Sequence, residues 1–208
     1  VGSGSGNLAK KLKSHGYEVD CVIPSEFLAE NVRKKLDDHS TVHVCGFEDL
    51  NTERSYDLIL FSESFQYVKL AFSIDKIVEM LPEGGHLMIC DFFQKDTPGK
   101  SPLGGGHKWV KFEEKISSVP LTQITDIDIT EETAPTNDLL DSFVTQVLEP
   151  IKNMSGDYID SNYPRLNSFL KWKYEKRIKK INRVYFTGQL TGANFIKYKT
   201  YRLLLFKR

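Results

Sequence analysis

The chain has 208 residues, with 28 basic and 28 acidic side chains and a formal net charge of zero. This length suits a single domain with a small annex, and a hydrophobic fraction of 40% excludes a disordered or fibrous chain. No apolar run approaches the roughly 18 residues of a membrane span, and the start lacks a signal-peptide pattern. Cys21, Cys45 and Cys90 share no CxxC spacing, so we expect reduced thiols, no metal site and a cytoplasmic location.

The charges are distributed unevenly along the chain. Residues 171–208 carry twelve Lys and Arg against one acid, whereas residues 111–170 carry eleven acids against four bases. A solvated helix face with lysines on a strand edge would account for the basic end. The alternative is an anionic partner, whether nucleic acid, a phosphate-bearing substrate or an acidic membrane surface.

The first half of the chain alternates helix-like and strand-like segments. Apolar spacing predicts helices over residues 8–13, 26–36 and 71–81, with Ser25 as the N-cap of the second. Runs rich in apolar and β-branched residues predict strands over residues 18–23, 41–45, 56–61 and 86–93. This alternation is typical of a parallel α/β sheet.

The second half follows a different pattern. A Gly- and Pro-rich loop over residues 98–106 precedes a predicted strand at 124–129. Residues 137–181 contain a single glycine, Gly156, and predict two or three helices, before a last strand at 198–207. This helical stretch indicates an insertion that covers another part of the protein.

Gly2, Gly4 and Gly6 form a GxGxG motif at the start of the first predicted helix. Glycine permits backbone angles closed to other residues and lets a ligand approach the main chain, and helix N-terminal amides favour an electron-rich ligand. A dinucleotide fingerprint would have its third glycine one place later, where this chain has Asn7. The spacing therefore favours a loop of the S-adenosylmethionine-binding type, although tight glycine turns also serve as plain connections.

Five segments occur in the order and at the spacing of one family: VGSGSGNLAKKL, CVIPSEFLAENVRKKL, CGFEDL, YDLILFSESFQYV and LPEGGHLMICDFF. Over most of residues 1–93 the chain resembles the class I S-adenosylmethionine-dependent methyltransferases. The DFF segment, followed by DITEETAPT and the helical insertion, is most similar to the small-molecule enzymes of the ubiquinone, sterol and tocopherol type. SESF stands where amide and adenine-N6 methyltransferases have an NPPY-like element, which counts against those reactions.

The resemblance implies an α/β, Rossmann-like fold: a seven-stranded, mostly parallel sheet with an antiparallel last strand and a helical lid insertion. Residues 1–136 would form the cofactor-binding core, 137–182 the lid, and 183–208 the return to the core. The family's first strand precedes its glycines, so we expect that strand to lie upstream of Val1. The cofactor would lie across the carboxyl ends of the strands.

The resemblance also implies which residues contact S-adenosylmethionine, whose product is S-adenosylhomocysteine. They come from the glycine loop, the end of the second family strand, the adenine-side loop and the end of the fourth: Gly2, Ser3, Gly4, Gly6, Ile23, Pro24, Ser25, Phe47, Glu48 and Ser62. Phe47 would pack against adenine and Glu48 would hydrogen-bond it. Ile23 stands where the family has an acid that binds the ribose, with Asp20 three residues too early, so we expect another group, such as Ser25, to hold the ribose.

Methyl transfer from a sulfonium is an in-line displacement that depends on positioning and on a base for the acceptor's proton. The candidate catalytic residues are His107, Asp91 and Glu63. His107 would be a base near neutral pH, or a solvated loop histidine. Asp91 would orient substrate or act as a base, or serve only in a structural hydrogen bond. The candidate substrate-binding residues are Gln66, Tyr67, Phe143 and Phe195.

The sequence thus predicts an enzyme that methylates a small or lipid-like molecule. One alternative is a nucleic-acid (RNA) methyltransferase that uses the basic C-terminal segment, which predicts steep salt dependence of binding. A second is a degenerate, non-catalytic cofactor-binding subunit, which Ile23 in the acidic position keeps open. We expect no integral membrane segment, and the acceptor and the oligomeric state stay open.

Overall fold

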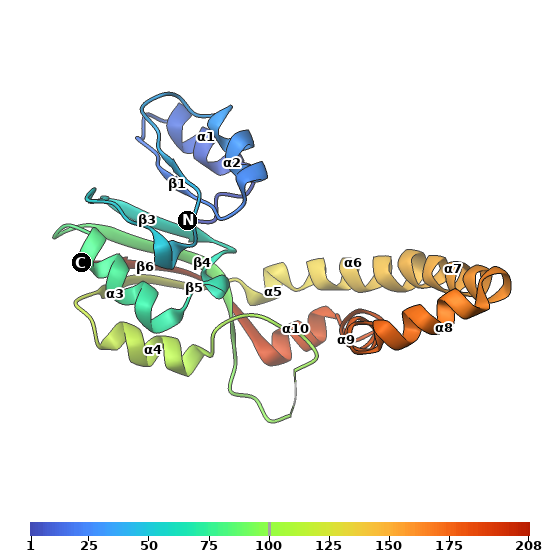
Figure 1. Cartoon of the computed structure of the whole chain (residues 1–208). Helices are drawn as coiled ribbons and strands as arrows, with labels where there is room; N and C mark the ends of the chain where they lie inside the picture. Colours follow the sequence, from blue (N-terminus) through green and yellow to red (C-terminus); the bar gives the residue numbers. More distant parts are fainter. Residues whose placement is uncertain (100) are drawn as a thin grey trace. The chain divides into compact units, whose positions relative to one another are not determined.

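The computed structural model describes residues 1–99 and 101–208 (Figure 1). The chain forms two compact units, which we call the sheet unit and the helical unit. The sheet unit comprises Val1–Gln94, Gly105–Asp128 and Tyr201–Arg208; the helical unit comprises Lys95–Gly104 and Ile129–Thr200. The helical unit therefore includes more of the chain than the predicted insertion over residues 137–182.

Six strands occur in the described residues, and each falls on a segment that the sequence predicted as a strand. They are β1 (Cys21–Val22), β2 (Val42–His43), β3 (Leu58–Ser62), β4 (His86–Gln94), β5 (Thr122–Asp128) and β6 (Lys199–Lys207). β1 and β2 form a parallel pair, and the other four form a sheet of order β3-β4-β6-β5 in which β3 and β4 are parallel and β5 and β6 antiparallel. The predicted count of seven strands is not confirmed, because the described residues supply six.

The start of the chain lies between the two groups of strands. The Val1 amine donates to the Leu60 carbonyl at 2.7 Å, and the Gly2 amide donates to the Val22 carbonyl at 2.8 Å. The Ser64 hydroxyl also donates to the Val1 carbonyl at 2.8 Å. These bonds connect β1, β3 and the segment after β3, so the glycine loop is anchored where the strands end.

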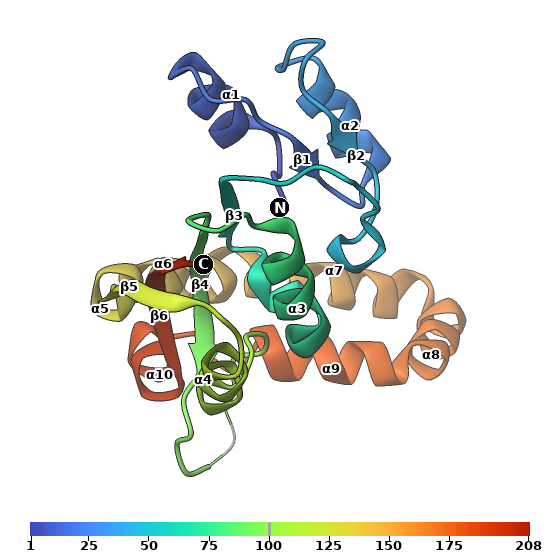
Figure 2. The ribbon, with the colours of Figure 1, turned by 90° about the vertical axis from the view of Figure 1, so that its left-hand side faces the viewer.

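The core of the sheet unit lies against β3 and β4. Side chains alternate along β4, and the buried ones are Leu87, Ile89, Asp91 and Phe93. Helices α3 (Leu70–Met80) and α4 (Trp109–Ser117) lie side by side against the sheet (Figure 2). The sequence interpretation missed α4, which buries Phe112 and Ile116.

Two further helices flank β1 and β2, as the sequence predicts. α1 (Asn7–Ser14) begins directly after Gly6, and α2 (Glu26–Arg33) begins after Ser25. The Ser25 hydroxyl accepts from the Leu28 amide at 3.4 Å, which confirms Ser25 as the N-cap. Short 3₁₀ turns, η1 (Phe47–Asp49) and η2 (Phe65–Tyr67), follow β2 and β3.

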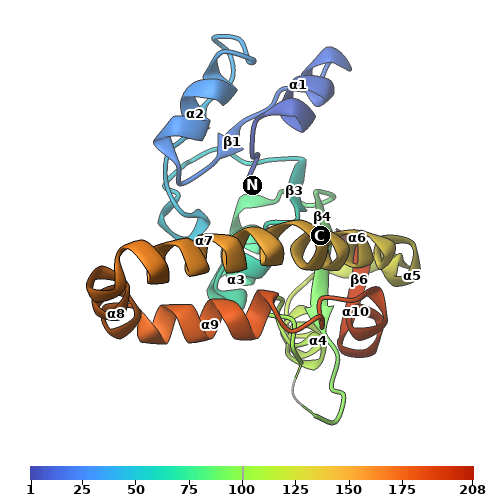
Figure 3. The ribbon, with the colours of Figure 1, turned by 90° about the vertical axis from the view of Figure 1, so that its right-hand side faces the viewer.

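The helical unit is built from one long interrupted helix and a return. The segments are α5 (Thr130–Thr133), α6 (Pro135–Phe143), the π-helical η3 (Val144–Leu148), α7 (Glu149–Asn162), α8 (Pro164–Lys173), α9 (Glu175–Tyr185) and α10 (Gly192–Tyr198). Pro150 explains the π turn: it lacks the amide hydrogen that an α-helix would use, and a wider turn before it relieves the clash of its ring. Figure 3 shows α7 and α9 running alongside each other, with α8 joining them.

Carboxylates fix the base of this helical unit. Asp138 accepts from the Gly192 amide at 2.8 Å, and Asp141 accepts from the Leu190 amide at 3.0 Å. The N-terminus of α10 is thereby attached to α6. Within residues 1–99 and 101–208, no helix has the length and apolar character that crossing a bilayer requires.

The close packing of Gly2 makes a stability prediction. Gly2 has φ +68°, and a Cβ there would lie 2.4 Å from the Ser64 Cβ; Gly16 has φ +88° and nothing within 4 Å of its Cβ position. Both Gly→Ala variants would suffer the left-handed strain of about 1 kcal/mol, but Gly2→Ala adds a clash worth roughly 1–3 kcal/mol. Urea unfolding followed by Trp109 fluorescence in a Trp172→Phe background measures this difference, and equal losses would contradict it.

Candidate functional site

The glycine loop has the backbone that its sequence predicts. Gly2, Gly4 and Gly6 have φ values of 68°, 53° and 79°. Gly2 and Gly6 pack closely, against Ser64 and Val32, whereas the Cβ position of Gly4 has no atom within 4 Å. Gly6 caps α1 without a side-chain hydrogen bond, so the first amides of α1 are available to a ligand.

Ile23 follows β1 directly, at the place where the sequence analysis expects the ribose of the cofactor. Ile23 is buried, and its amide donates to the His43 carbonyl at 3.0 Å. Asp20 accepts from the Thr41 amide at 2.7 Å and from the Tyr56 hydroxyl at 3.0 Å, and its other polar contact is Arg54 at 3.0 Å. Asp20 therefore connects the start of β1 to the segments around Thr41 and Tyr56.

The two adenine-side residues are both engaged within the protein. Phe47 is 3% exposed and meets the Phe61 ring edge-on, with centroids 5.2 Å apart. The Glu48 carboxylate accepts from the Lys69 amide at 2.6 Å, immediately before α3. Phe47 thus belongs to the core, and Glu48 fixes the start of α3.

A polar cluster lies at the carboxyl end of β3. Glu63 follows Ser62 with a positive φ of 52°, which is strained for a residue with a side chain. Its carboxylate accepts from the Tyr201 hydroxyl at 2.9 Å, and that hydroxyl lies 3.9 Å from the Cys90 sulfur. Burial and the neighbouring carboxylate both raise the pKa of Tyr201, so its hydroxyl stays protonated and donates to Glu63.

Asp91 takes a core position in the alternation of β4 and has no solvent exposure. Its carboxylate accepts from the Gln66 amide at 3.1 Å and from the Phe92 amide at 2.8 Å. Burial raises the pKa of Asp91, and these backbone hydrogen bonds oppose the rise. The carboxyl therefore fixes η2 against β4.

His107 lies over the same end of the sheet. Its Nε2 is 2.9 Å from the Phe65 carbonyl, and its ring meets the Phe65 ring edge-on at 5.5 Å. A carbonyl only accepts hydrogen bonds, so the neutral ring carries its proton on Nε2 and its lone pair on Nδ1. The segment just before His107 is held by Gln94, whose side-chain amide donates to the Gly105 and Gly106 carbonyls at 3.0 and 2.7 Å.

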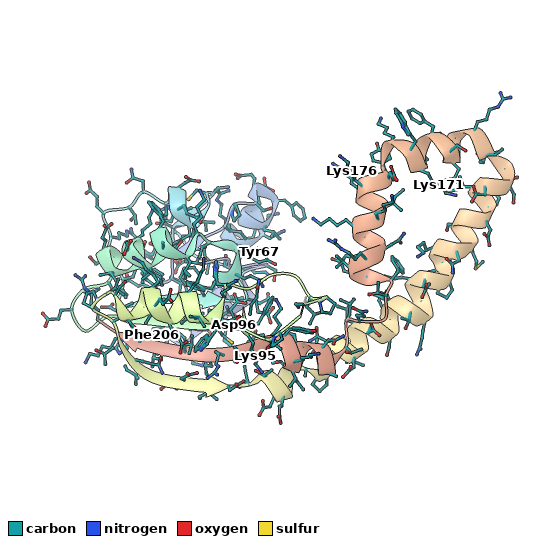
Figure 4. The ribbon with its side chains drawn as sticks, turned by 90° about the horizontal axis from the view of Figure 1, so that it is seen from below. Tyr67, Lys95, Asp96, Lys171, Lys176 and Phe206 are labelled. Atoms are coloured by element: carbon teal, nitrogen blue, oxygen red, sulfur yellow. The ribbon has the colours of Figure 1, made fainter. Side chains whose placement is uncertain are left out.

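The sheet unit thus brings together most of the predicted site residues. Gln66 is half-buried against Asp91, and Tyr67 is 78% exposed (Figure 4). Phe143 and Phe195 belong to the helical unit, where Phe143 is half exposed and Phe195 is buried. Sequence reasoning missed Tyr201, since no local signal connects it with Glu63, which is 138 positions away.

The first part of the chain is similar to a known family. Residues 1–89 match the family model described as "Methyltransferase domain". A curated relative, an uncharacterized methyltransferase of Staphylococcus carnosus (strain TM300), is 34% identical over 108 residues, which are 50% of each chain. The chain thus spans about half the length of this relative.

Solved structures share the fold. A putative sarcosine dimethylglycine methyltransferase from Galdieria sulphuraria aligns with a TM-score of 0.66 at 16% identity, over 99% of this chain and 76% of that one. Geranyl diphosphate C-methyltransferase from Streptomyces coelicolor A3(2), in complex with Mg²⁺, geranyl diphosphate and S-adenosylhomocysteine, aligns with a TM-score of 0.66 at 16% identity, over 100% and 68%. Residues 1–89 are thus similar to a methyltransferase domain, and the chain shares the fold of these solved methyltransferases.

The buried Asp91 carboxyl predicts a pH-dependent stability difference. A raised pKa in the folded state contributes stability below the unfolded pKa of about 3.9, and that stability is lost as pH rises through the folded pKa. The side-chain amide of an Asp91→Asn variant would not titrate, so the stability of the wild type minus that of the variant should fall from about pH 4 upward. Urea unfolding at a series of pH values tests this, and a difference that grows with pH would show that the backbone hydrogen bonds outweigh burial.

Proposed function

We propose that the sheet unit binds S-adenosylmethionine and transfers its methyl group to a small or lipid-like molecule. The observation that carries the proposal is the left-handed turn at Gly2, Gly4 and Gly6, with open space over Gly4, at the N-terminus of α1. Its support includes the structural neighbours, some of which were solved with S-adenosylmethionine or S-adenosylhomocysteine.

The residues present fit this cofactor in four respects. The uncapped amides of α1 would receive the carboxylate of the methionine portion. Gly4 would let the cofactor approach the backbone closely, because a side chain there would occupy the open space. The Glu63 carboxylate would add a negative charge favourable to the cofactor's cationic groups. Ser25 and Pro24 would hold the ribose side, since Ile23 carries no polar group.

S-adenosylmethionine supplies an electrophilic methyl group on a sulfonium, and S-adenosylhomocysteine is the product. The chain's own residues would position the acceptor and take its proton. We assign the proton-accepting role to Nδ1 of His107, because Nε2 is committed to the Phe65 carbonyl. Glu63 is fixed by the Tyr201 hydroxyl, and Asp91 would act as a positioning residue through the backbone of Gln66 rather than as a base.

The acceptor class is inferred from the neighbours and from the helical unit. Related folds include enzymes named for geranyl diphosphate and coclaurine, which are small organic molecules. Exposed apolar side chains of the helical unit, among them Phe143, Val147 and Ile151, would suit an apolar acceptor. We propose Gln66 and Tyr67 as the acceptor contacts of the sheet unit, and the lid role of the helical unit, with Phe143 and Phe195, stays a prediction from the sequence.

A non-catalytic cofactor-binding subunit is a second candidate, and one observation favours it. Ile23 is 3% exposed, so the ribose position has an apolar residue built into the core rather than a missing side chain. An RNA methyltransferase is the remaining alternative from the sequence. Turnover of a small acceptor would argue against the non-catalytic subunit, and turnover of RNA alone would establish the RNA methyltransferase.

Methyl transfer from radiolabelled S-adenosylmethionine to a panel of quinol, sterol and prenyl acceptors tests the proposal. Gly4→Ala would place a methyl group in the proposed cofactor space and lower transfer by at least about tenfold. Gly188→Ala is the matched control, since Gly188 has φ +62° and the same empty surroundings, but lies in the helical unit. Equal effects of the two substitutions, in variants that melt alike, would contradict a cofactor site at Gly4.

A further inference from the structure

The hairpin of α8 and α9, residues 164–185, exposes its apolar side chains together with its charged ones. Every residue from 171 to 183 is exposed. Trp172 is 74% exposed, and Leu166, Phe169 and Ile181 are each about half exposed. A soluble surface rarely concentrates so much apolar area in one segment unless the area meets a partner.

The same hairpin is strongly basic. Residues 164–185 carry eight Lys and Arg against one acid, Glu175. That acid is already paired, since the Lys179 ammonium lies 2.5 Å from its carboxylate. α7 (Glu149–Asn162), on the other side of the helical unit, has three acids and one base, so the positive charge belongs to the hairpin itself.

The apolar and the basic side chains of α9 lie on opposite faces of the helix. Ile178, Ile181 and Tyr185 are spaced by three and four residues and therefore share one face of the helix. The opposite face carries Lys176, Lys179, Lys180 and Arg183. Lys171 and Lys176 lie where α8 meets α9, on either side of Trp172 and Tyr174 in the sequence (Figure 4).

We propose that the α8–α9 hairpin is a peripheral docking surface for an anionic lipid bilayer. A basic amphipathic helix with aromatic side chains lies in the headgroup region, with its apolar face toward the acyl chains and its cations on anionic lipids. Aliphatic Ile178, Ile181 and Leu166 favour a bilayer over nucleic acid, because stacking on bases needs aromatic rings or guanidinium planes. A second copy of this chain is disfavoured, since two such hairpins would bring like charges together.

This inference goes beyond the proposed methyl transfer and does not rest on it. Vesicle binding is measured without cofactor or acceptor, so its failure would leave the enzymatic proposal untouched. If both hold, the hairpin brings the protein to the surface where lipid-like acceptors reside.

Flotation of the full chain with vesicles of phosphatidylcholine alone, or mixed with phosphatidylglycerol, tests the docking surface. We expect the protein to bind only the vesicles that contain phosphatidylglycerol, and we expect this binding to weaken as the salt concentration rises. The double variant Lys176→Glu/Lys180→Glu should bind at least about tenfold more weakly. Lys10→Glu/Lys11→Glu is the matched control, with the same charge change on α1 of the sheet unit, and should bind as the wild type does.

A second pair of variants separates a bilayer from other polyanions. Trp172→Ala should weaken vesicle binding, whereas Phe27→Ala, on α2 and 73% exposed, should not. Brominated lipids should quench the fluorescence of Trp172. The proposal is overturned by absence of binding to anionic vesicles, or by binding that the hairpin variants do not change. It is also overturned if binding depends on charge alone, without Trp172 or quenching, because the hairpin would then be a site for a soluble polyanion.

Discussion

Left-handed backbone at Gly2, Gly4 and Gly6 is the constraint on which the candidate site depends. The Gly2 amide is hydrogen-bonded to β1 and the Val1 amine before it to β3, and Gly2 approaches Ser64 too closely for any side chain. Gly6 turns the chain into α1, and its packing against Val32 joins the loop to α2. Gly4, between them, has nothing over it. The loop is thus fixed at both ends and open in the middle, as a ligand-binding turn requires.

The second requirement is a rigid end of the sheet, which two carboxylates supply in different ways. Asp91 occupies a core position on β4, and two backbone amides offset part of the cost of burying it. Glu63 stands at a strained backbone position after β3, and Tyr201 of β6 holds its carboxylate. Hydrogen bonds from distant parts of the chain therefore fix the polar groups beside the glycine loop. Preorganisation of this kind is what a displacement reaction needs from a protein.

Sequence patterns predicted the strands because apolar runs and alternation are local signals, and each predicted segment inside the chain became a strand. α4 was missed although Trp109, Phe112 and Ile116 have helical spacing, because the preceding glycine-rich loop suggested continued irregular structure. The interaction of Tyr201 with Glu63 could not be predicted from the sequence, since only the fold brings the two residues together. The π turn before Pro150 was equally hidden, because proline in a sequence indicates a break more often than a widened turn.

The helical unit has a different kind of surface, formed by the exposed apolar and basic side chains of α8 and α9. The proposed role of this surface is to bind an anionic bilayer, whereas the glycine loop is the proposed cofactor site. Methyl transfer requires first that the glycine loop binds the cofactor. Isothermal titration calorimetry of the chain with S-adenosylmethionine and S-adenosylhomocysteine tests it most directly. The account predicts that both bind at one shared site, each excluding the other. A folded protein that binds neither would contradict it.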